Sequence, residues 1–133
     1  MASIKNIQSI NKACAQALIE SGVRTTEQLI EAGSTSTDRM KLADETHLTH
    51  ELVKEWVHKA DLFRIKGMSG EHVELLCGLG YCTVPKIAYL RADDVFNELD
   101  NTVLPEFKGN IPTIRQLEAY INSAKKLPKV IHH

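Results

Sequence analysis

The chain has 133 residues, of which 43% are hydrophobic and 25% are charged, and its net charge is −1. This length suits one domain or two small ones packed together, and the composition is that of a soluble globular protein. Residues 1–62 carry seven basic and nine acidic side chains, and residues 63–133 carry nine and eight. Neither half has the strongly basic composition of a tight, non-specific DNA binder.

No apolar run approaches the roughly 20 residues of a membrane-spanning helix, and Met1–Asn6 lacks the pattern of a signal peptide. The sequence therefore predicts a cytoplasmic protein without membrane association. Its three cysteines, Cys14, Cys77 and Cys82, have no framework spacing. They are expected to be reduced, buried or half-buried thiols, although the last two straddle a glycine turn that can bring them close.

The first third of the chain predicts three helices. The first runs from about Asn11 to Ser21, has one apolar face and is stopped by Gly22. The threonine pair at 25–26 supplies the cap of the second helix, which ends at residues 32–33. The polar stretch 34–38 is expected to be a loop and cap before a short third helix.

The longest predicted helix runs from about His50 to Arg64, behind an N-cap at Thr49. Its apolar residues recur with the helical period, which indicates one buried face. They are Leu52, Val53, Trp56, Val57, Ala60 and Phe63. Trp56, the single tryptophan, is the expected core anchor of this face.

A tight turn at residues 66–70 follows, and then a helix over Glu71–Cys77 stopped by glycines. Thr83 caps the next helix, with Pro85 in its first turn, where the missing N–H costs nothing. A short helix starts at residues 92–94, and a loop occupies residues 100–112.

Thr113 caps a last helix to about Leu127, which Pro128 ends. No strand pattern persists for more than a few residues. The predicted fold is therefore all-α, with about eight to nine helices.

An internal repeat is the most specific signal in the sequence. Several apolar, glycine and threonine positions recur with a constant offset of 58, and two later pairs recur with an offset of 64. The pairs are Ile7–Ile65, Ile10–Met68, Leu18–Leu76, Gly22–Gly80, Thr25–Thr83 and Leu29–Ile87, then Trp56–Tyr120 and Ala60–Ala124. This pattern predicts two pseudo-equivalent units, residues 1–64 and 65–133, packed as one compact body through the long central helix.

Each unit resembles the helix-hairpin-helix repeat, whose pattern is hydrophobic-x-Gly-hydrophobic-Gly followed by a helix that ends in Gly, a hydrophobic residue and Thr. Residues 65–83 carry this pattern. The first unit resembles the paired helix-hairpin-helix domain at the N-terminus of archaeal RecA-like recombinases. Over residues 4–130 the chain resembles a bacterial family of unknown function built from two such units, marked here by residues 56–67 and 124–128.

This resemblance implies binding to the DNA backbone without base reading, through the turn's amides and a nearby Lys or Arg. The sequence departs from the pattern at three of four turns. The glycine positions hold Ser9 and Asn11 in the first turn and His47 in the turn before the long helix, and the pattern dissolves at residues 107–112. The central turn keeps the first glycine, while its second position is a serine with a glycine displaced by one.

The predicted nucleic-acid contacts are therefore the four residues of the central turn and two neighbouring cations: Lys66, Gly67, Ser69, Gly70, Lys12 and Arg64. The tail lysines at 125, 126 and 129 add positive charge. The alternatives are that the turn only joins two helices, that Lys12 is a solvated surface lysine, and that the last-turn lysines only complement the helix dipole.

The predicted function is a non-catalytic module that binds nucleic-acid backbone weakly and without sequence preference. The alternative is a protein–protein interaction or self-association adaptor, in which the partner is another protein or a second copy. No nucleophile, phosphate-loop or paired-carboxylate motif indicates an enzyme. The histidines and cysteines lack zinc-site spacing, so neither metal nor cofactor nor small-molecule substrate is expected. His132 and His133, native or from a tag, receive no role.

Overall fold

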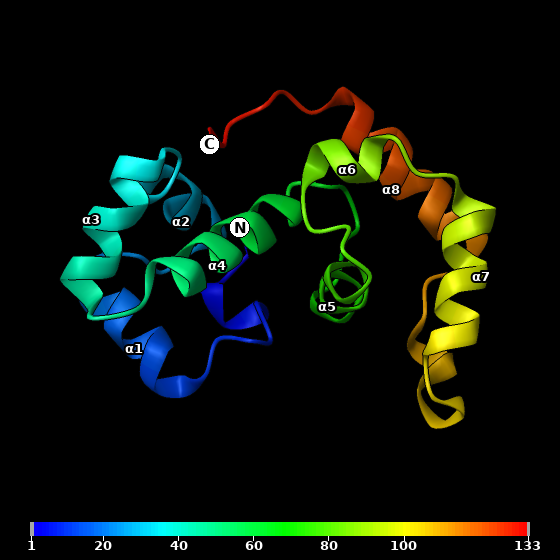
Figure 1. Ribbon diagram of the computed structural model, residues 1–133, viewed down its shortest axis with the longest axis horizontal. Helices are drawn as coiled ribbons and strands as arrows, with labels where there is room; N and C mark the ends of the chain where they lie inside the picture. The colour runs from blue at the N-terminus through cyan, green and yellow to red at the C-terminus, as the bar shows by residue number, and fades with distance from the viewer. Residues whose placement is uncertain (1, 133) are drawn as a thin grey trace.

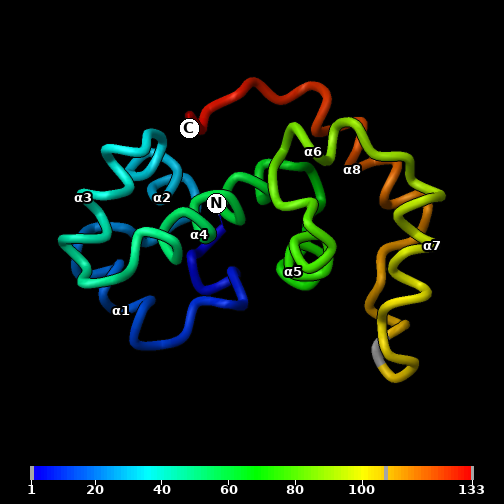
Figure 2. The backbone as a smooth tube through the Cα atoms, in the orientation of Figure 1, coloured from blue at the N-terminus to red at the C-terminus, as the bar shows by residue number. Residues whose placement is uncertain are grey.

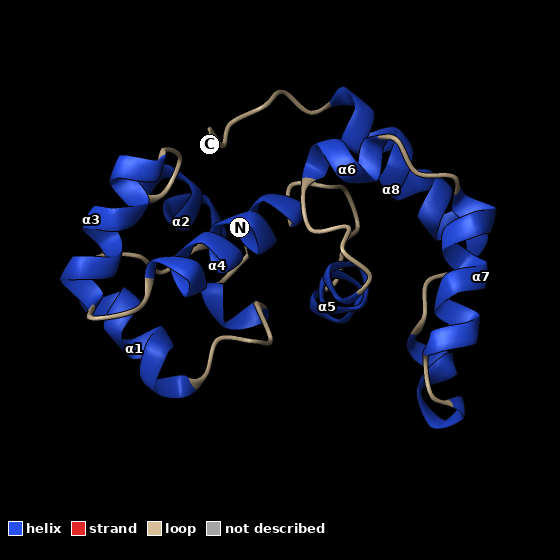
Figure 3. Cartoon of the chain, viewed as in Figure 1, coloured by secondary structure: helices blue, strands red, loops and turns tan. Residues whose placement is uncertain are grey.

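The computed structural model describes residues 2–132, so Met1 and His133 lie outside the described residues. Over that range the chain is helical and contains no strand (Figures 1 and 3), which confirms the predicted all-α fold. Eight α-helices and two 3₁₀ helices follow one another: η1 (Ile4–Asn6), α1 (Lys12–Glu20), α2 (Thr26–Ala32), α3 (Ser36–Thr46), α4 (His50–Leu62), α5 (Gly70–Gly78), α6 (Val84–Ala88), α7 (Ala92–Thr102), η2 (Pro105–Asn110) and α8 (Ile114–Lys126).

Side-chain caps explain where most helices begin. The hydroxyls of Thr25, Thr49, Thr83 and Thr113 each accept a hydrogen bond from the backbone N–H three residues on, at 3.1–3.2 Å. At Thr25 and Thr113 a glutamine side chain returns the bond and completes a capping box. Because each cap contributes about 1 kcal/mol, these helix starts are strongly specified by local sequence.

Two expected stretches differ from the structure. The third helix is not short: Thr35 caps it, so it starts at Ser36 inside the expected loop and runs for 11 residues until His47 adopts a left-handed conformation with φ 60°. The expected loop over residues 100–112 contains the end of α7 and the 3₁₀ helix η2.

Two hydrophobic clusters form the core. The first gathers η1 and α1–α4, and the second gathers α5–α8 together with Leu62 and Ile65. Helix α4 packs against α2, α3 and α5, and Trp56 on its inner face is 1% exposed, as the sequence predicts. Phe63 contacts both clusters, so the end of α4 is where the two cores meet.

The two clusters begin with the same local conformations, 58 residues apart. Asn11 and Ser69 cap helices of nine residues each, α1 and α5. After these helices, Gly22 and Gly80 have φ of +95° and +93°. A side chain at either position would be strained, because this left-handed region is favoured by glycine.

Buried Lys59 connects the part of the chain before α5 to α5 through hydrogen bonds. Its side chain is 6% exposed, and its Nζ donates to Ser9 Oγ at 3.1 Å and to Glu74 Oε1 at 2.8 Å. One ammonium group thus joins the first turn, α4 and α5. Since a buried charge is tolerated when it is paired and hydrogen-bonded, this lysine sets how α5 sits on the first half.

The C-terminal tail returns to the first cluster (Figure 2). Ile131 is buried in that cluster, and the His132 N–H donates to Ser34 O at 2.7 Å. Arg39, 2% exposed, donates to Gly33 O at 2.9 Å and to His132 O at 3.0 Å. The tail, which the sequence places in the second unit, therefore packs on the first.

The cysteines correct one sequence expectation. Cys77 and Cys82 form a disulfide with Cα atoms 4.3 Å apart, and Cys14 is a free, half-buried thiol. The expectation that Cys77 and Cys82 are reduced thiols is therefore wrong for this structure. The turn at Gly80, where the Tyr81 N–H donates to Leu76 O at 2.9 Å, folds residue 82 back onto the end of α5. Within residues 2–132 no helix has both the length and the apolar composition needed to cross a membrane.

Candidate nucleic-acid interface

The central turn presents only part of its predicted contact surface to solvent. Lys66, Gly67 and Ser69 are exposed and Gly70 is half-buried, and Gly67 has φ +82°. A Cβ there would meet nothing nearer than Tyr120 Cε1 at 3.9 Å. The backbone conformation, rather than crowding, therefore requires this glycine. The Lys66 N–H donates to Ser123 Oγ at 3.0 Å, which fixes the start of the turn against α8.

The other two turn residues have structural tasks. Ser69 caps α5, because its Oγ accepts from the His72 N–H at 3.3 Å. Gly70 lies against the first turn: a Cβ on it would be 2.5 Å from Asn6 O. The first turn therefore covers one side of the central turn, and Gly70 permits this close approach rather than the approach of a phosphate.

Gly70→Ala is expected to lower the free energy of unfolding by roughly 1–3 kcal/mol, because the methyl group must push a backbone carbonyl aside. Gly78→Ala is the matched control: it lies in the same helix, and its added Cβ would meet nothing within 4 Å. That change should be neutral or stabilising by up to about 1 kcal/mol. Urea unfolding of both variants checks this, and equal effects would contradict the packing role of Gly70.

The two predicted cations outside the turn differ in their surroundings. The guanidinium of Arg64 pairs with Asp61, with 2.6 Å between Nε and Oδ1, and donates to Pro128 O at 2.8 Å. Arg64 therefore holds the tail as well as lining a cleft. Lys12 is exposed in the first turn of α1 and does not line that cleft.

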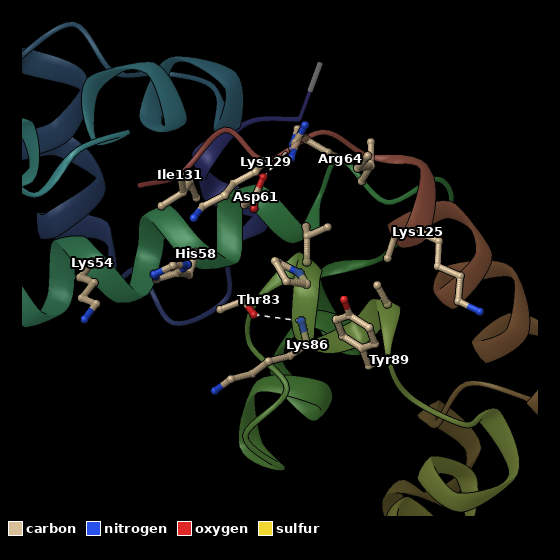
Figure 4. A pocket seen from close by; sticks show the side chains of 15 residues that line it. Lys54, His58, Asp61, Arg64, Thr83, Lys86, Tyr89, Lys125, Lys129 and Ile131 are labelled. Atoms are coloured by element: carbon tan, nitrogen blue, oxygen red, sulfur yellow. Dashed lines mark hydrogen bonds and ion pairs between the residues drawn. The ribbon is translucent and has the colours of Figure 1, made fainter. Parts of the chain in front are cut away.

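A cleft of about 1010 Å³ lies between α4, α6, the end of α8 and the tail (Figure 4). We call it the basic cleft. Its charged lining comprises five cations and a single carboxylate, that of Asp61: Lys54, Arg64, Lys86, Lys125 and Lys129 are the cations. His58 and Thr83 are its uncharged polar members, and the rest of the wall is apolar: Val84, Pro85, Ala88, Tyr89, Ala124, Leu127 and Ile131.

Charge is therefore strongly segregated in this protein. With His58 neutral, five cations and one carboxylate give the cleft a net charge of +4, so the remainder of the chain carries −5 to reach the total of −1. Burial raises the pKa of Asp61, and its ion pair with Arg64 opposes that shift. The one acidic group is thus paired inside the wall, and the four lysines are exposed around it.

Sequence reasoning identified Arg64 and the tail lysines but missed Lys54 and Lys86. One signal was present: Lys54, His58 and Asp61 follow one another at i, i+4 and i+7 on α4, which places three polar side chains along one face of the helix. Lys86 had no such signal, since only the packing of α6 against α8 brings it to the cleft.

A half-buried histidine connects the central turn to α8. His72 Nδ1 lies 2.6 Å from the Tyr120 hydroxyl, and Nε2 lies 3.1 Å from Asn110 O. Because the carbonyl can only accept, Nε2 carries the proton of the neutral ring and Nδ1 accepts from the hydroxyl. The single proton of that hydroxyl is shared between Nδ1 and Gly67 O, 3.3 Å away, so the turn, α5 and α8 meet at Tyr120.

We expect stability to fall on mild acidification through His72. Burial lowers the pKa of His72 from its ordinary value of 6.5, while the Asn110 carbonyl and Glu71 oppose the shift. The unfolded chain then binds this proton more tightly than the folded chain, so stability drops as pH falls below 6.5 toward the folded-state pKa and is level above it. His72→Gln, whose amide can still donate to Asn110 O, should flatten that part of the curve. Urea midpoints across this range measure it, and an unchanged slope in the variant would contradict the assignment.

No three of the His, Cys, Asp and Glu side chains in residues 2–132 converge in a way that could hold a metal ion. Searches of curated proteins and of solved structures each found no match. The model of a family described as a domain of unknown function, DUF4332, matches residues 8–127, which run from the first turn to the end of α8. The chain therefore belongs to the DUF4332 family.

Proposed function

We propose that this chain is a non-catalytic module of two tandem helix-hairpin-helix units that binds nucleic-acid backbone weakly and without reading bases. The conformations that recur 58 residues apart, at Asn11 and Ser69 and at Gly22 and Gly80, support the two-unit interpretation. We also propose that the first unit is similar in fold to the N-terminal domain of archaeal RecA-like recombinases.

The basic cleft is the observation that carries this function. The net charge of −1 does not attract a polyanion to the protein as a whole. However, the Debye length is only about 10 Å at 0.1 M salt, so distant charges are screened. A bound phosphate therefore responds to the nearest charges, and in the cleft these sum to +4. Contacts from lysine to phosphate position a backbone without carrying sequence information.

The central turn has a secondary part in this proposal. Lys66 follows Arg64, which lines the cleft, by two residues, and with Gly67 it faces solvent. Ser69 caps α5 and Gly70 packs against Asn6, so both have structural roles. The turn can therefore add one phosphate contact to those of the cleft, and Lys66→Glu should weaken binding less than a change within the cleft.

The test is a fluorescence titration of a labelled single strand and a duplex of the same length at low salt, repeated as salt is raised. If four lysines contact phosphates, the slope of log K against log salt for the single strand is expected to be about −3. No binding at low salt, or binding that does not change with salt, would remove the nucleic-acid function.

A second candidate is protein–protein interaction, including self-association. The exposed apolar side chains of Leu104 and Ile114, which flank η2, favour it because they lie on the surface without a partner. Size-exclusion chromatography with light scattering tests self-association: a single monomeric species at high concentration would exclude the homodimer.

A cytoplasmic location remains part of the proposal. The Cys77–Cys82 disulfide argues against it, because such bonds are rare in reducing compartments. Thiol alkylation of cells before lysis, followed by mass spectrometry, shows whether Cys77 and Cys82 are reduced in the cell. Alkylation of both cysteines supports a cytoplasmic location, and unalkylated cysteines exclude it.

A further inference from the structure

We infer that the basic cleft takes a single nucleic-acid strand and that Tyr89 stacks one of its bases. This inference rests on the proposed function and adds a ligand class and a residue to it. The juxtaposition that carries it is an exposed aromatic ring among lysines at the edge of an apolar wall (Figure 4).

Tyr89 is held in place by the end of α6 yet is left open to solvent. Its backbone N–H donates to Lys86 O at 3.3 Å, which makes it the C-cap of the helix. The residue is nevertheless 89% exposed, the highest value among the large apolar residues of the described chain that reach the surface. A rigid backbone with an uncovered ring offers a flat surface at little entropic cost.

The surroundings of the ring match a nucleotide strand in two ways. Lys86 lies on the same short helix and Lys125 on α8, so ammonium groups that can hold phosphates flank the ring. Most of the remaining wall is apolar, with His58 and Thr83 as its polar members, and its one carboxylate is paired with Arg64, so a planar base meets no unpaired negative charge. Single strands are bound in this way, by a positive groove with aromatic side chains on which bases stack.

Other polyanions fit the cleft less completely. In a duplex the faces of the bases are stacked inside the helix, so a duplex can use the lysines but not Tyr89. An acidic peptide likewise satisfies the lysines and leaves the ring uncovered. The dependence of binding on Tyr89 therefore distinguishes a single strand from both.

The experiment compares labelled oligo-dT with an abasic strand of the same length, which keeps every phosphate and lacks the bases. For the intact chain we expect oligo-dT to bind about tenfold more tightly, the effect of one stacked base. Tyr89→Ala should reduce this ratio to near one, and Tyr89→Phe should preserve it. Emission of buried Trp56 in each variant reports that the fold is intact.

The outcomes separate the two proposals. If both strands bind with strong salt dependence but their ratio is near one in the intact chain, or is unchanged in Tyr89→Ala, stacking is excluded and backbone binding stands. If neither strand nor a duplex binds, both proposals fail. If a polyglutamate peptide binds as tightly as oligo-dT and with the same Tyr89 dependence, the cleft is a peptide site and this inference is overturned.

Discussion

Arg39→Ala is expected to lower the free energy of unfolding by about 3 kcal/mol. The guanidinium bridges Gly33 O and His132 O, at 2.9 and 3.0 Å, from a position that is 2% exposed. Hydrogen bonds to a charged group contribute roughly 1.5–3 kcal/mol each, and the truncation also leaves a cavity. Arg39 Nε is buried and has no hydrogen-bond partner among the described residues, so its removal offsets part of this loss.

Arg39→Met separates these effects, because it keeps most of the packing and removes the two hydrogen bonds and the charge. It should lose about half as much stability as the alanine variant. Truncation after residue 127 removes the His132 carbonyl that Arg39 contacts, so Arg39→Ala should cost less in the truncated chain than in the intact one. Additive losses in urea unfolding would show that Arg39 does not act through the tail.

Reversing two cleft charges, with Lys86→Glu and Lys125→Glu together, is expected to weaken single-strand binding about a thousandfold at low salt. At about 4 Å in water a lysine–phosphate attraction is near 1 kcal/mol, and each reversal turns it into a similar repulsion. The salt slope should also fall by about 1.4, because two phosphate contacts are lost. Both lysines are exposed, so the fold should tolerate the change.

Lys41→Glu with Lys126→Glu provides the matched control. Both side chains are exposed, neither lines the cleft, and the change in net charge is the same. Lys126 is also the chain neighbour of Lys125, so the comparison tests position and not only charge. If this pair weakens binding as much as the cleft pair, net charge governs the interaction and the cleft does not.

Local sequence predicted the helices well because their starts depend on neighbouring residues. Thr49, Thr83 and Thr113 cap where the pattern indicates, and the long helix is found at His50–Leu62, within two residues of its predicted end. The third helix was misjudged because Thr35, rather than a later residue, caps it. A run of Ser and Thr contains several possible caps, and local chemistry does not choose among them.

The candidate site could not be predicted in the same way, because contacts between distant residues create it. The basic cleft joins Lys54, Lys86 and Lys129 from three elements, and near-neutral totals concealed their grouping. Gly70 has the residue type that a phosphate-binding turn requires, yet the structure uses it for contact with Asn6. A motif thus identifies a residue type, and only packing shows what that residue approaches.

Lysine footprinting tests most directly whether the basic cleft holds nucleic acid. The intact chain is acetylated briefly with and without saturating oligo-dT, and each modified lysine is quantified by mass spectrometry. We predict protection of the four exposed cleft lysines, Lys54, Lys86, Lys125 and Lys129, with Lys12 and Lys41 unchanged. Uniform protection, or protection of Lys12 with the cleft lysines still reactive, would contradict the assignment of binding to the cleft.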